Sequence, residues 1–424
     1  MKRDRIEALG ATAVSRFSSI KAGGGKTWLP ARSLLARWLR SLGNPPLSFV
    51  LWNGQEAGAP QAARQWRLHI HDQPALLKLL ADPQFQFGEL FSAGRIELEG
   101  DLVPFLEMTY RAYERGRLGR RLGELRSRLH PPRRNTFATA RDNIHHHYDI
   151  GNDFYRLWLD ERMLYTCAYF EAPGASLEQA QLAKMDHVAR KLRLKPGQRV
   201  VEAGCGWGAL ALHMAQHYGV TVKAYNISRE QIAYAQQSAR RAGLAERVEF
   251  IEADFREIRG KFDVFVSVGM LEHVGPKNYA HLGAAIDACL TDDGVGLIHS
   301  IGRNRRAPMN PWIERRIFPG AYPPSLREMT PIFERFGFSV LDVENLRLHY
   351  ARTLEHWLAR FDSRADEVRA MFDETFVRTW RLYLAGSIAA FSTGDLQLFQ
   401  AVFARAANNA IPWTREFLYR HDTR

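Results

Sequence analysis

The chain has 424 residues, of which 46% are hydrophobic, and its 58 lysines and arginines against 46 aspartates and glutamates give a formal net charge of +12. This composition excludes a disordered, collagen-like or low-complexity protein, and the length indicates two or three domains. The cysteines Cys167, Cys205 and Cys289 are too few and too scattered for a disulfide framework or a zinc site. Because no apolar run could span a bilayer and the N-terminus lacks the apolar stretch of a secretory signal, we expect a basic cytoplasmic protein.

The pattern of strand-like and helix-like runs in residues 1–110 predicts a small α+β domain for binding or docking. Strand-like runs occur at 47–52 and 66–71, and a helix-like run follows at 74–81. A turn at Gly94, a short strand at 95–99 and a helix from about Asp101 complete the unit. We find no catalytic constellation in this part of the sequence.

The excess positive charge is concentrated between Arg111 and Arg141, where ten arginines stand against two glutamates. Leucines at three- and four-residue spacing predict an amphipathic linker helix over residues 111–141, with Pro131-Pro132 as its end signal. Such a helix is either a solvated linker or a contact for an anionic surface, meaning lipid headgroups or nucleic acid. Because no base-stacking or groove-reading features accompany it, we expect no nucleic-acid partner.

Residues 174–305 alternate between strand-like and helix-like segments. We expect strands at 198–204, 220–227, 248–254, 262–269 and 294–301, with one helix ending at Tyr218 and another opened by Ser228. This alternation predicts a doubly wound parallel α/β sheet within a catalytic domain over residues 142–424. After Pro323 we expect mostly helices, including the segment 396–411.

A glycine-rich loop, Gly204-Cys205-Gly206-Trp207-Gly208, follows the first expected strand and opens a helix. Such a loop lets the backbone pass close to a ligand, and the helix start offers free N–H groups. The loop also satisfies the dinucleotide fingerprint, which requires an acidic residue about 20 positions further on. That position holds an asparagine at 226, so the dinucleotide interpretation is weakened.

S-adenosylmethionine is the alternative ligand for this loop. Glu202, just before it, provides a negative charge for a cationic ligand that has no pyrophosphate. Asp254 would suit the exocyclic amine of adenine, and Phe255 the plane of the base. Asp254 alone is typical of an ordinary turn, but its position at the carboxyl end of a strand favours a ligand role.

Six segments stand out as motifs: HYDIGNDFYRLWLD (147–160), MLYTCAYF (163–170), VVEAGCGWGALALHMA (200–215), FDVFVSVGMLEHVGPKNY (262–279), GLIHSIG (296–302) and PWIERRIFPGAYPPS (311–325). In this order they resemble the cyclopropane-fatty-acyl-phospholipid synthases, a family that includes the mycolic acid cyclopropane synthases. The similarity runs from about Asn143 to about Ala404. Residues 1–110 resemble the family's small lipid-binding domain less sharply.

The resemblance implies a Rossmann-like class I methyltransferase sheet with a small N-terminal α+β domain and helical C-terminal additions. It implies methyl transfer from S-adenosylmethionine to the cis double bond of an unsaturated acyl chain in a membrane phospholipid. The resulting carbocation would lose a proton to a bound bicarbonate ion as the cyclopropane ring closes. The bicarbonate cage that it implies is Cys167 (through its main chain), Glu272, His299, Ile301 (through its N–H) and Tyr350. The S-adenosylmethionine site that it implies is Tyr165, Thr166, Glu202, Gly204, Gly206, Asn226, Gln231, Asp254 and Phe255.

Competing interpretations exist for several of these residues. Because a carboxylate beside an anion is repelled, we expect Glu272 to be protonated or to share a proton with the ion. We expect Cys167 to be a small buried residue rather than a nucleophile. A lone His299 in an apolar strand would ordinarily be a hydrogen-bonded core histidine, and only the matched segment favours a site role. The adjacent histidines at 145–147 do not share a helix face, so we expect no metal site.

Aromatic side chains could line an acyl tunnel and stabilise a carbocation by cation–π attraction, with core packing as the competing explanation. The candidates are Tyr148, Phe154, Tyr155, Trp158, Tyr169, Phe170, Trp312 and Phe318. The arginine-rich helix becomes the expected contact with an anionic membrane surface, which implies peripheral association. A homodimer is plausible by resemblance. A methyl- or methylene-branched product, or methylation of a small amine, are the alternative activities.

Overall fold

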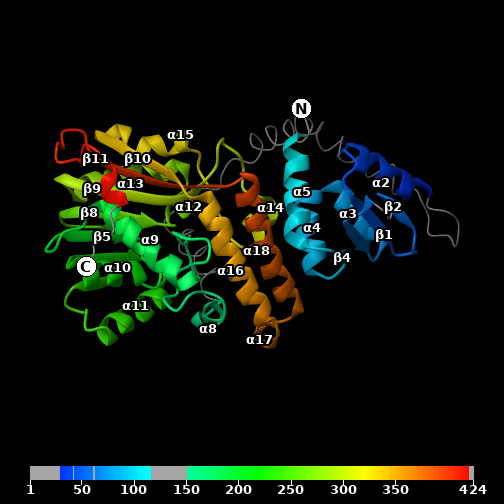
Figure 1. The fold of residues 1–424 in the computed structure, drawn as a ribbon, viewed down its shortest axis with the longest axis horizontal. Helices are drawn as coiled ribbons and strands as arrows, with labels where there is room; N and C mark the ends of the chain where they lie inside the picture. The colour runs from blue at the N-terminus through cyan, green and yellow to red at the C-terminus, as the bar shows by residue number, and fades with distance from the viewer. Residues whose placement is uncertain (1–28, 42, 61–62, 116–149, 420–424) are drawn as a thin grey trace, which may run out of the picture.

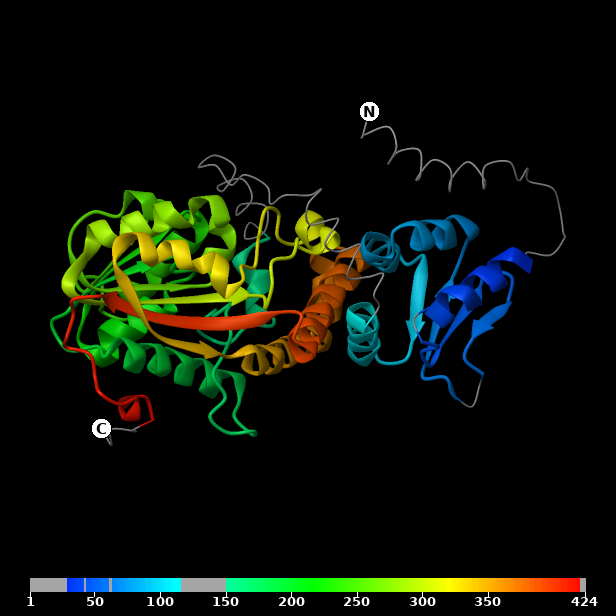
Figure 2. The ribbon, with the colours of Figure 1, turned by 90° about the horizontal axis from the view of Figure 1, so that it is seen from above.

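The computed structural model describes residues 29–41, 43–60, 63–115 and 150–419. Residues 29–115 form an α+β unit at one end of the molecule (Figure 1 and Figure 2). Its four-stranded sheet has the order β2-β1-β3-β4, with β1 parallel to β3 and antiparallel to β2. The elements are α2 (Leu29–Ser41), β1 (Leu47–Leu51), β2 (Glu56–Gly58), β3 (Trp66–Ile70), α3 (Gln73–Ala81), α4 (Pro83–Ser92), β4 (Ile96–Glu99) and α5 (Leu102–Arg115).

Local sequence explains much of this unit. Along β3, Trp66, Leu68 and Ile70 are buried and alternate with two half-buried residues, as one covered sheet face requires. The expected strands and the helices near 74 and 101 are confirmed, whereas α2, β2 and α4 were not foreseen. Helix α5 runs past residue 110, so the domain boundary expected there falls inside a helix. The arginine-rich segment beyond Arg115 lies outside the described residues.

Residues 150–419 form the second unit, which we expect to be catalytic, and this catalytic unit is built on a seven-stranded sheet of order β10-β11-β9-β8-β5-β6-β7. Strands β5 to β9 are parallel, which confirms the expected doubly wound sheet, and β11 is antiparallel to both its neighbours. The strands are β5 (Arg199–Ala203), β6 (Thr221–Asn226), β7 (Val248–Glu252), β8 (Phe262–Val268), β9 (Leu290–Gly302), β10 (Phe338–Asn345) and β11 (Gln397–Arg405).

Helices cover both faces of this sheet (Figure 2). They are α8 (Asn152–Arg156), α9 (Leu177–Leu192), α10 (Ala209–Tyr218), α11 (Arg229–Arg241), α12 (Leu271–Val274), α13 (Tyr279–Cys289), α14 (Pro311–Arg316), α15 (Leu326–Met329), α16 (Arg347–Ser363), α17 (Ala365–Met371) and α18 (Glu374–Thr393). Val200 on β5 packs with α9, α10 and α11, whereas Val201 packs in a separate cluster with α12 and α13. Successive side chains of a strand point to opposite faces, so one strand contributes to both clusters.

The helix expected at 396–411 is wrong. Residues 397–405 form strand β11, which lies between β9 and β10. All residues of β11 before Arg405 are buried, because both faces of the sheet are covered. A strand covered on both faces has no alternation of polar and apolar residues. Its hydrophobic pattern therefore does not distinguish it from a buried helix. The C-terminal additions are therefore two strands as well as helices.

The two units meet through α4, α14 and α18. Arg316 donates to both carboxylate oxygens of Glu89, at 2.7 and 2.5 Å. Gly88 lies against the ring of Trp312, so closely that a Cβ at this position would come within 2.5 Å of it. Arg378 on α18 donates to the main-chain oxygen of residue 91 at 2.6 Å. This contact places the α+β unit as one wall beside the catalytic unit. Within the described residues, no helix combines the length and apolarity needed to cross a bilayer.

Candidate active site

Two adjoining cavities lie at the carboxyl edge of the parallel strands, where open α/β sheets bind their ligands. The first, the glycine-loop pocket, has a volume of about 140 Å³ and lies beyond the ends of β5, β6, β7 and β8. The second, the interdomain cavity, has a volume of about 1080 Å³ and is lined by both units. Four residues line both cavities: Tyr165, Thr166, Gly269 and His273. A group bound in one cavity therefore lies beside a group bound in the other.

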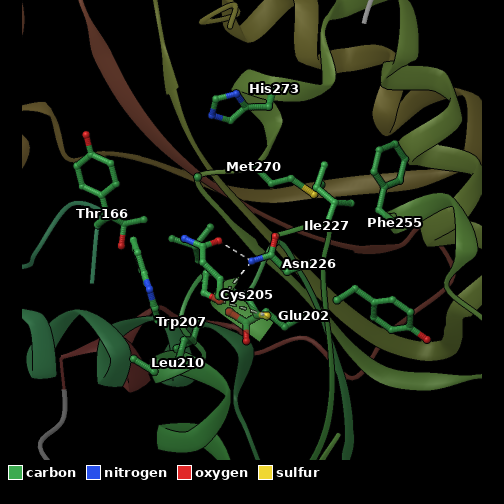
Figure 3. Close-up of a pocket in the computed structure, with 18 of the residues that line it drawn as sticks. Thr166, Glu202, Cys205, Trp207, Leu210, Asn226, Ile227, Phe255, Met270 and His273 are labelled. Carbon is green, nitrogen blue, oxygen red and sulfur yellow. Dashed lines mark hydrogen bonds between the residues drawn. The ribbon is translucent and has the colours of Figure 1, made fainter. Parts of the chain in front are cut away.

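The glycine loop needs its glycines for conformation and space. Gly204 has φ +83°, and a Cβ there would meet the Cβ of Met270 at 2.8 Å. Gly206 also has a positive φ, but nothing lies within 4 Å of where its Cβ would be. The loop is fixed from the side by Trp207, whose Nε1 donates to Asn152 Oδ1 at 2.7 Å. The N–H groups of Gly204 and Cys205 donate to the main-chain oxygen of Tyr225, at 2.8 and 3.1 Å. Cys205 and Trp207 of the loop line the pocket (Figure 3).

An amide pair links the loop to the next strand. Asn226 Nδ2 donates to Gln231 Oε1 at 2.7 Å and to the main-chain oxygen of Gly206 at 3.3 Å (Figure 3). Ser228 caps α11, as expected, and accepts a hydrogen bond from the N–H of Gln231 at 3.4 Å. Asn226 therefore links the glycine loop to α11 through its amide. A dinucleotide site would have a carboxylate at this position.

Two acidic side chains line the pocket from different strand ends. Glu202 is 2% exposed, its Oε2 has no hydrogen-bond partner among the described residues, and burial raises the pKa of its carboxyl to about 7. Asp254 begins the short turn Phe255–Glu257 and accepts from the N–H of Arg256 at 3.0 Å, and burial raises its pKa too. Asp254 thus acts as a turn cap and also borders the pocket, with Phe255 beside it.

All of the residues that the resemblance implied for S-adenosylmethionine line the glycine-loop pocket. They are Tyr165, Thr166, Glu202, Gly204, Gly206, Asn226, Gln231, Asp254 and Phe255. The buried, unpartnered carboxylate oxygen of Glu202 suits a cationic ligand, and the free space beside Gly206 suits a ligand that approaches the backbone. These residues fit S-adenosylmethionine.

Glu272 and Ile301 form the centre of the second group of residues. Glu272 lies on α12, directly after β8, and its Oε1 accepts the N–H of Ile301 at 2.6 Å. Its Oε2 is buried and has no hydrogen-bond partner among the described residues. Burial raises the pKa of the carboxyl to about 7, the direction expected of a carboxyl that holds a proton near neutral pH. The N–H expected to contact bicarbonate is thus already donated to Glu272.

His299 lies two residues before Ile301 on β9 and borders the same cavity. The side-chain amide of Gln400, on the neighbouring strand β11, lies 2.9 Å from His299 Nδ1 and forms a hydrogen bond with the ring. Burial lowers the pKa of the imidazole to about 3, so the ring is neutral. The side chain is both a hydrogen-bonded core histidine and part of the cavity wall.

Tyr350 and Cys167 complete this group. Tyr350, on α16, packs its ring 4.6 Å from that of Phe391 and lines the interdomain cavity. The Cys167 thiol lies 3.2 Å from the main-chain oxygen of Ala168, and burial raises its pKa well above the ordinary value. A protonated, buried thiol is a poor nucleophile, which agrees with the expectation of a small buried residue. The interdomain cavity therefore brings together Cys167, Glu272, His299, Ile301 and Tyr350.

Comparison with known proteins identifies the family. The model for mycolic acid cyclopropane synthetase matches residues 135–401. A probable fatty acid methyltransferase of Pseudomonas putida is 35% identical over 398 residues, covering 88% of this chain and 96% of that relative. The chain belongs to the mycolic acid cyclopropane synthetase family. It is an S-adenosylmethionine-dependent methyltransferase with the class I fold, and the matches support modification of lipid acyl chains.

Two further relatives of the cyclopropane synthetase family agree with this assignment. The cyclopropane-fatty-acyl-phospholipid synthase of Escherichia coli (strain K12) is 41% identical over 267 residues, covering 62% of this chain and 68% of that relative. The crystal structure of mycolic acid cyclopropane synthase CmaA1 complexed with SAH and CTAB matches with a TM-score of 0.59 and 31% identity. That match covers 62% of this chain and 97% of the CmaA1 chain.

The structure separates the described aromatic candidates of this cyclopropane synthetase family member into three groups. Trp312 and Phe318 line the interdomain cavity. Phe154, Tyr155 and Trp158 are fully buried and pack on one another, so core packing is the correct explanation for them. Two more pack against histidine rings: Tyr169 on His187 and His349, and Phe170 on His356. Tyr148 and the histidines at 145–147 lie outside the described residues.

Sequence reasoning missed three site residues. His273 lines both cavities and directly follows Glu272, so its place in the matched segment was an available signal. Gln400, which orients His299, stood in a segment expected to be helical. Lys184 lines the glycine-loop pocket from the middle of α9, where no motif marks it. In the part of the chain that the structure describes, no cluster of three or more metal-ligating side chains occurs.

Proposed function

We propose that this enzyme transfers the methyl group of S-adenosylmethionine to the cis double bond of an unsaturated acyl chain in a membrane phospholipid, forming a cyclopropane ring. The observation that carries this proposal is the shared wall of the two cavities, at Tyr165, Thr166, Gly269 and His273. A donor held at the glycine loop would present its methyl group to a chain lying in the larger cavity. Holding both reactants in one geometry removes much of the entropic part of the barrier.

The interdomain cavity suits an acyl chain by size and lining. At about 1080 Å³ it is as large as the largest small-molecule pockets, which reach roughly 1000 Å³. Apolar side chains of the α+β unit, such as Phe49, Leu68 and Phe105, line it together with Leu354 and Leu398 of the catalytic unit. We therefore assign the α+β unit a lipid-binding role, as one wall of the acyl site.

Aromatic rings at the shared wall support a cationic intermediate on the acyl chain. Tyr165 borders both cavities, and its hydroxyl lies 2.8 Å from that of Tyr383. Phe318 contacts Tyr383 edge to face, with ring centroids 5.5 Å apart. Ring faces attract a nearby cation without offering a nucleophile that would trap it.

Loss of a proton from the added methyl group would close the ring, and a bicarbonate ion would supply the base. Glu272, His299, Tyr350 and the main chain of Cys167 line the cavity in which such an ion would lie. The N–H of Ile301 is donated to Glu272 Oε1, so Ile301 would position that carboxyl and not bind the ion directly. Glu272, whose raised pKa favours the protonated form, can donate through its unpartnered Oε2 instead of repelling the anion. With the Gln400 amide donating to Nδ1, the neutral His299 ring would carry its proton on Nε2 and could donate it to the ion.

The protein would work from the membrane surface. We assign the membrane contact to the arginine-rich segment 111–141, since each basic residue near an anionic bilayer adds about 1 kcal/mol of attraction. Vesicle binding is then expected to weaken as salt rises, and salt-insensitive binding would contradict this assignment. We further propose peripheral association from the cytoplasmic side and a homodimer.

A branched product is the second candidate. The Pseudomonas putida relative that matches most of this chain is named a probable fatty acid methyltransferase. The same cation gives a methylene-branched chain when it loses a proton without ring closure, and a methyl-branched chain when a separate hydride donor reduces it. Methylation of a small amine is less favoured, because an amine needs neither a large apolar cavity nor the group around Glu272 and His299.

Incubation with S-adenosylmethionine and vesicles of mono-unsaturated phospholipid, followed by mass spectrometry of the fatty acids, tests the proposal. A gain of one methylene in mass with loss of the alkene is the expected result. The same gain with an alkene retained would indicate the branched product. Vesicles with saturated chains serve as the control, and no modification of either vesicle would refute the proposal.

A further inference from the structure

A lysine is fully buried beside the glycine-loop pocket. Lys184 lies on α9, is 1% exposed and lines the pocket. Its Nζ donates to Thr166 Oγ1 at 3.0 Å, and the structure shows no other hydrogen bond from this ammonium among the described residues. A lysine ammonium has three donors, and a buried charge is costly unless it is paired. The arrangement therefore calls for an anion at this point of the pocket.

The two carboxyl groups near Lys184 do not form an ion pair with its ammonium. Glu202 and Asp160 are the carboxylates whose charge acts on Lys184, yet neither forms an ion pair with it. Asp160 instead accepts the N–H groups of residues 162 and 164, at 3.2 and 2.7 Å. Burial lowers the pKa of Lys184 only to about 8, so the ammonium remains charged at neutral pH.

Lys184 and Glu202 present an ammonium and a buried carboxyl to one small pocket, and a cationic ligand beside Glu202 would favour the ionised form of that carboxyl. The amino acid end of S-adenosylmethionine is a zwitterion, with an ammonium and a carboxylate on one carbon. The unpartnered Oε2 of Glu202 suits the ammonium, and Lys184 with the Thr166 hydroxyl suits the carboxylate. Arg256 also lines the pocket, where its guanidinium pairs with Asp254 at 3.5 Å.

We propose that Lys184, together with the Thr166 hydroxyl that it orients, forms the subsite for the methionyl carboxylate of the donor. This inference rests on the proposed use of S-adenosylmethionine and adds a residue to its site. Because Thr166 also borders the interdomain cavity, the same contact fixes the donor at the wall through which its methyl group must pass. Lys184 is thus a residue for donor affinity and orientation.

Binding measured by calorimetry tests the proposal without depending on turnover. The two probes are S-adenosylhomocysteine and its decarboxylated analogue, which lacks only the carboxylate. Wild type should bind S-adenosylhomocysteine about 10- to 100-fold more tightly than the analogue, the range of a charged hydrogen bond. Lys184→Met should remove this preference by weakening S-adenosylhomocysteine alone, and Lys184→Arg should restore part of it.

Lys191→Met is the matched control. Lys191 lies on the same helix, is equally buried, and pairs with Glu344 at 2.5 Å, away from the pocket. This variant should keep the wild-type preference between the two probes. Equal weakening of both probes by Lys184→Met would assign Lys184 a structural role and overturn the inference.

The wild-type comparison needs no mutation, so it can overturn the inference even where Lys184→Met does not fold. In that case Lys184→Arg, which keeps the charge, tests the lysine by a partial loss of the preference. Equal affinity of wild type for the two probes would overturn the inference and leave the proposed function intact. Failure of wild type to bind S-adenosylhomocysteine at all would instead contradict the proposed function.

Discussion

Replacing Glu272 by glutamine should change the pH dependence of stability. Glu272 is 6% exposed, and burial raises the pKa of its carboxyl from 4.5 to about 7. At 1.36 kcal/mol per pKa unit, this difference corresponds to about 3 kcal/mol. Glutamine keeps the oxygen that accepts the N–H of Ile301 and removes the titration. The variant therefore isolates the cost of a buried charge.

The direction in which stability changes with pH follows from the raised pKa of Glu272. Between pH 4.5 and about 7 the folded protein binds more protons at Glu272 than the unfolded chain, so the free energy of unfolding falls as pH rises. Wild type and Glu272→Gln should be similarly stable near pH 5. Near pH 8 the variant should be more stable than wild type by about 2–3 kcal/mol.

Urea unfolding in bicarbonate-free buffer, followed by tryptophan fluorescence, measures this difference. Glu249→Gln is the control for the exchange itself, because its side chain is 60% exposed on the sheet edge. A stability difference between Glu272→Gln and wild type that stays constant from pH 5 to pH 8 would refute the reasoning. The same variant should lose at least about 100-fold in turnover if the carboxyl moves or holds a proton in the reaction.

Three further substitutions test separate parts of the account. Cys167→Ser should retain most of the methyl transfer measured by fatty-acid mass spectrometry, and loss of nearly all activity would indicate a nucleophile. Gly204→Ala should weaken binding of S-adenosylhomocysteine about tenfold or more in calorimetry, because φ is +83° and the new Cβ would lie 2.8 Å from its neighbour. Gly88→Ala should lower the free energy of unfolding by about 1–3 kcal/mol, because its Cβ would overlap the ring of Trp312, and an unchanged value would show that the two units do not pack there.

The parallel part of the sheet was predictable because its local signals agree. Strands β5 to β8 are short runs that each contain two or more β-branched residues, and Ser228 gives a cap signal between β6 and α11. The carboxyl ends of parallel strands meet at one edge of the sheet, so the residues after β5, β7 and β8 were expected near one another. The glycine-loop pocket confirms that arrangement.

Strands β10 and β11 and the interdomain cavity depend on contacts between distant segments, which no local sequence pattern encodes. Strand β10 carries Asp342 and Glu344, which face the buried Lys191 of α9, and this pairing makes a charged strand stable. Residues 397–405 have no alternation because both faces of the sheet are covered. The interdomain cavity requires the packing of α4 against α14, through Gly88 and Trp312, and cannot be read from either segment alone.

The most direct measurement uses S-adenosylmethionine with a deuterated methyl group and vesicles of mono-unsaturated phosphatidylethanolamine. The account predicts that the label enters the acyl chain at the former double-bond carbons, with two of the three deuterium atoms retained after ring closure. Label found on the headgroup amine, or no label in the lipid, would contradict methyl transfer across the wall shared by the two cavities.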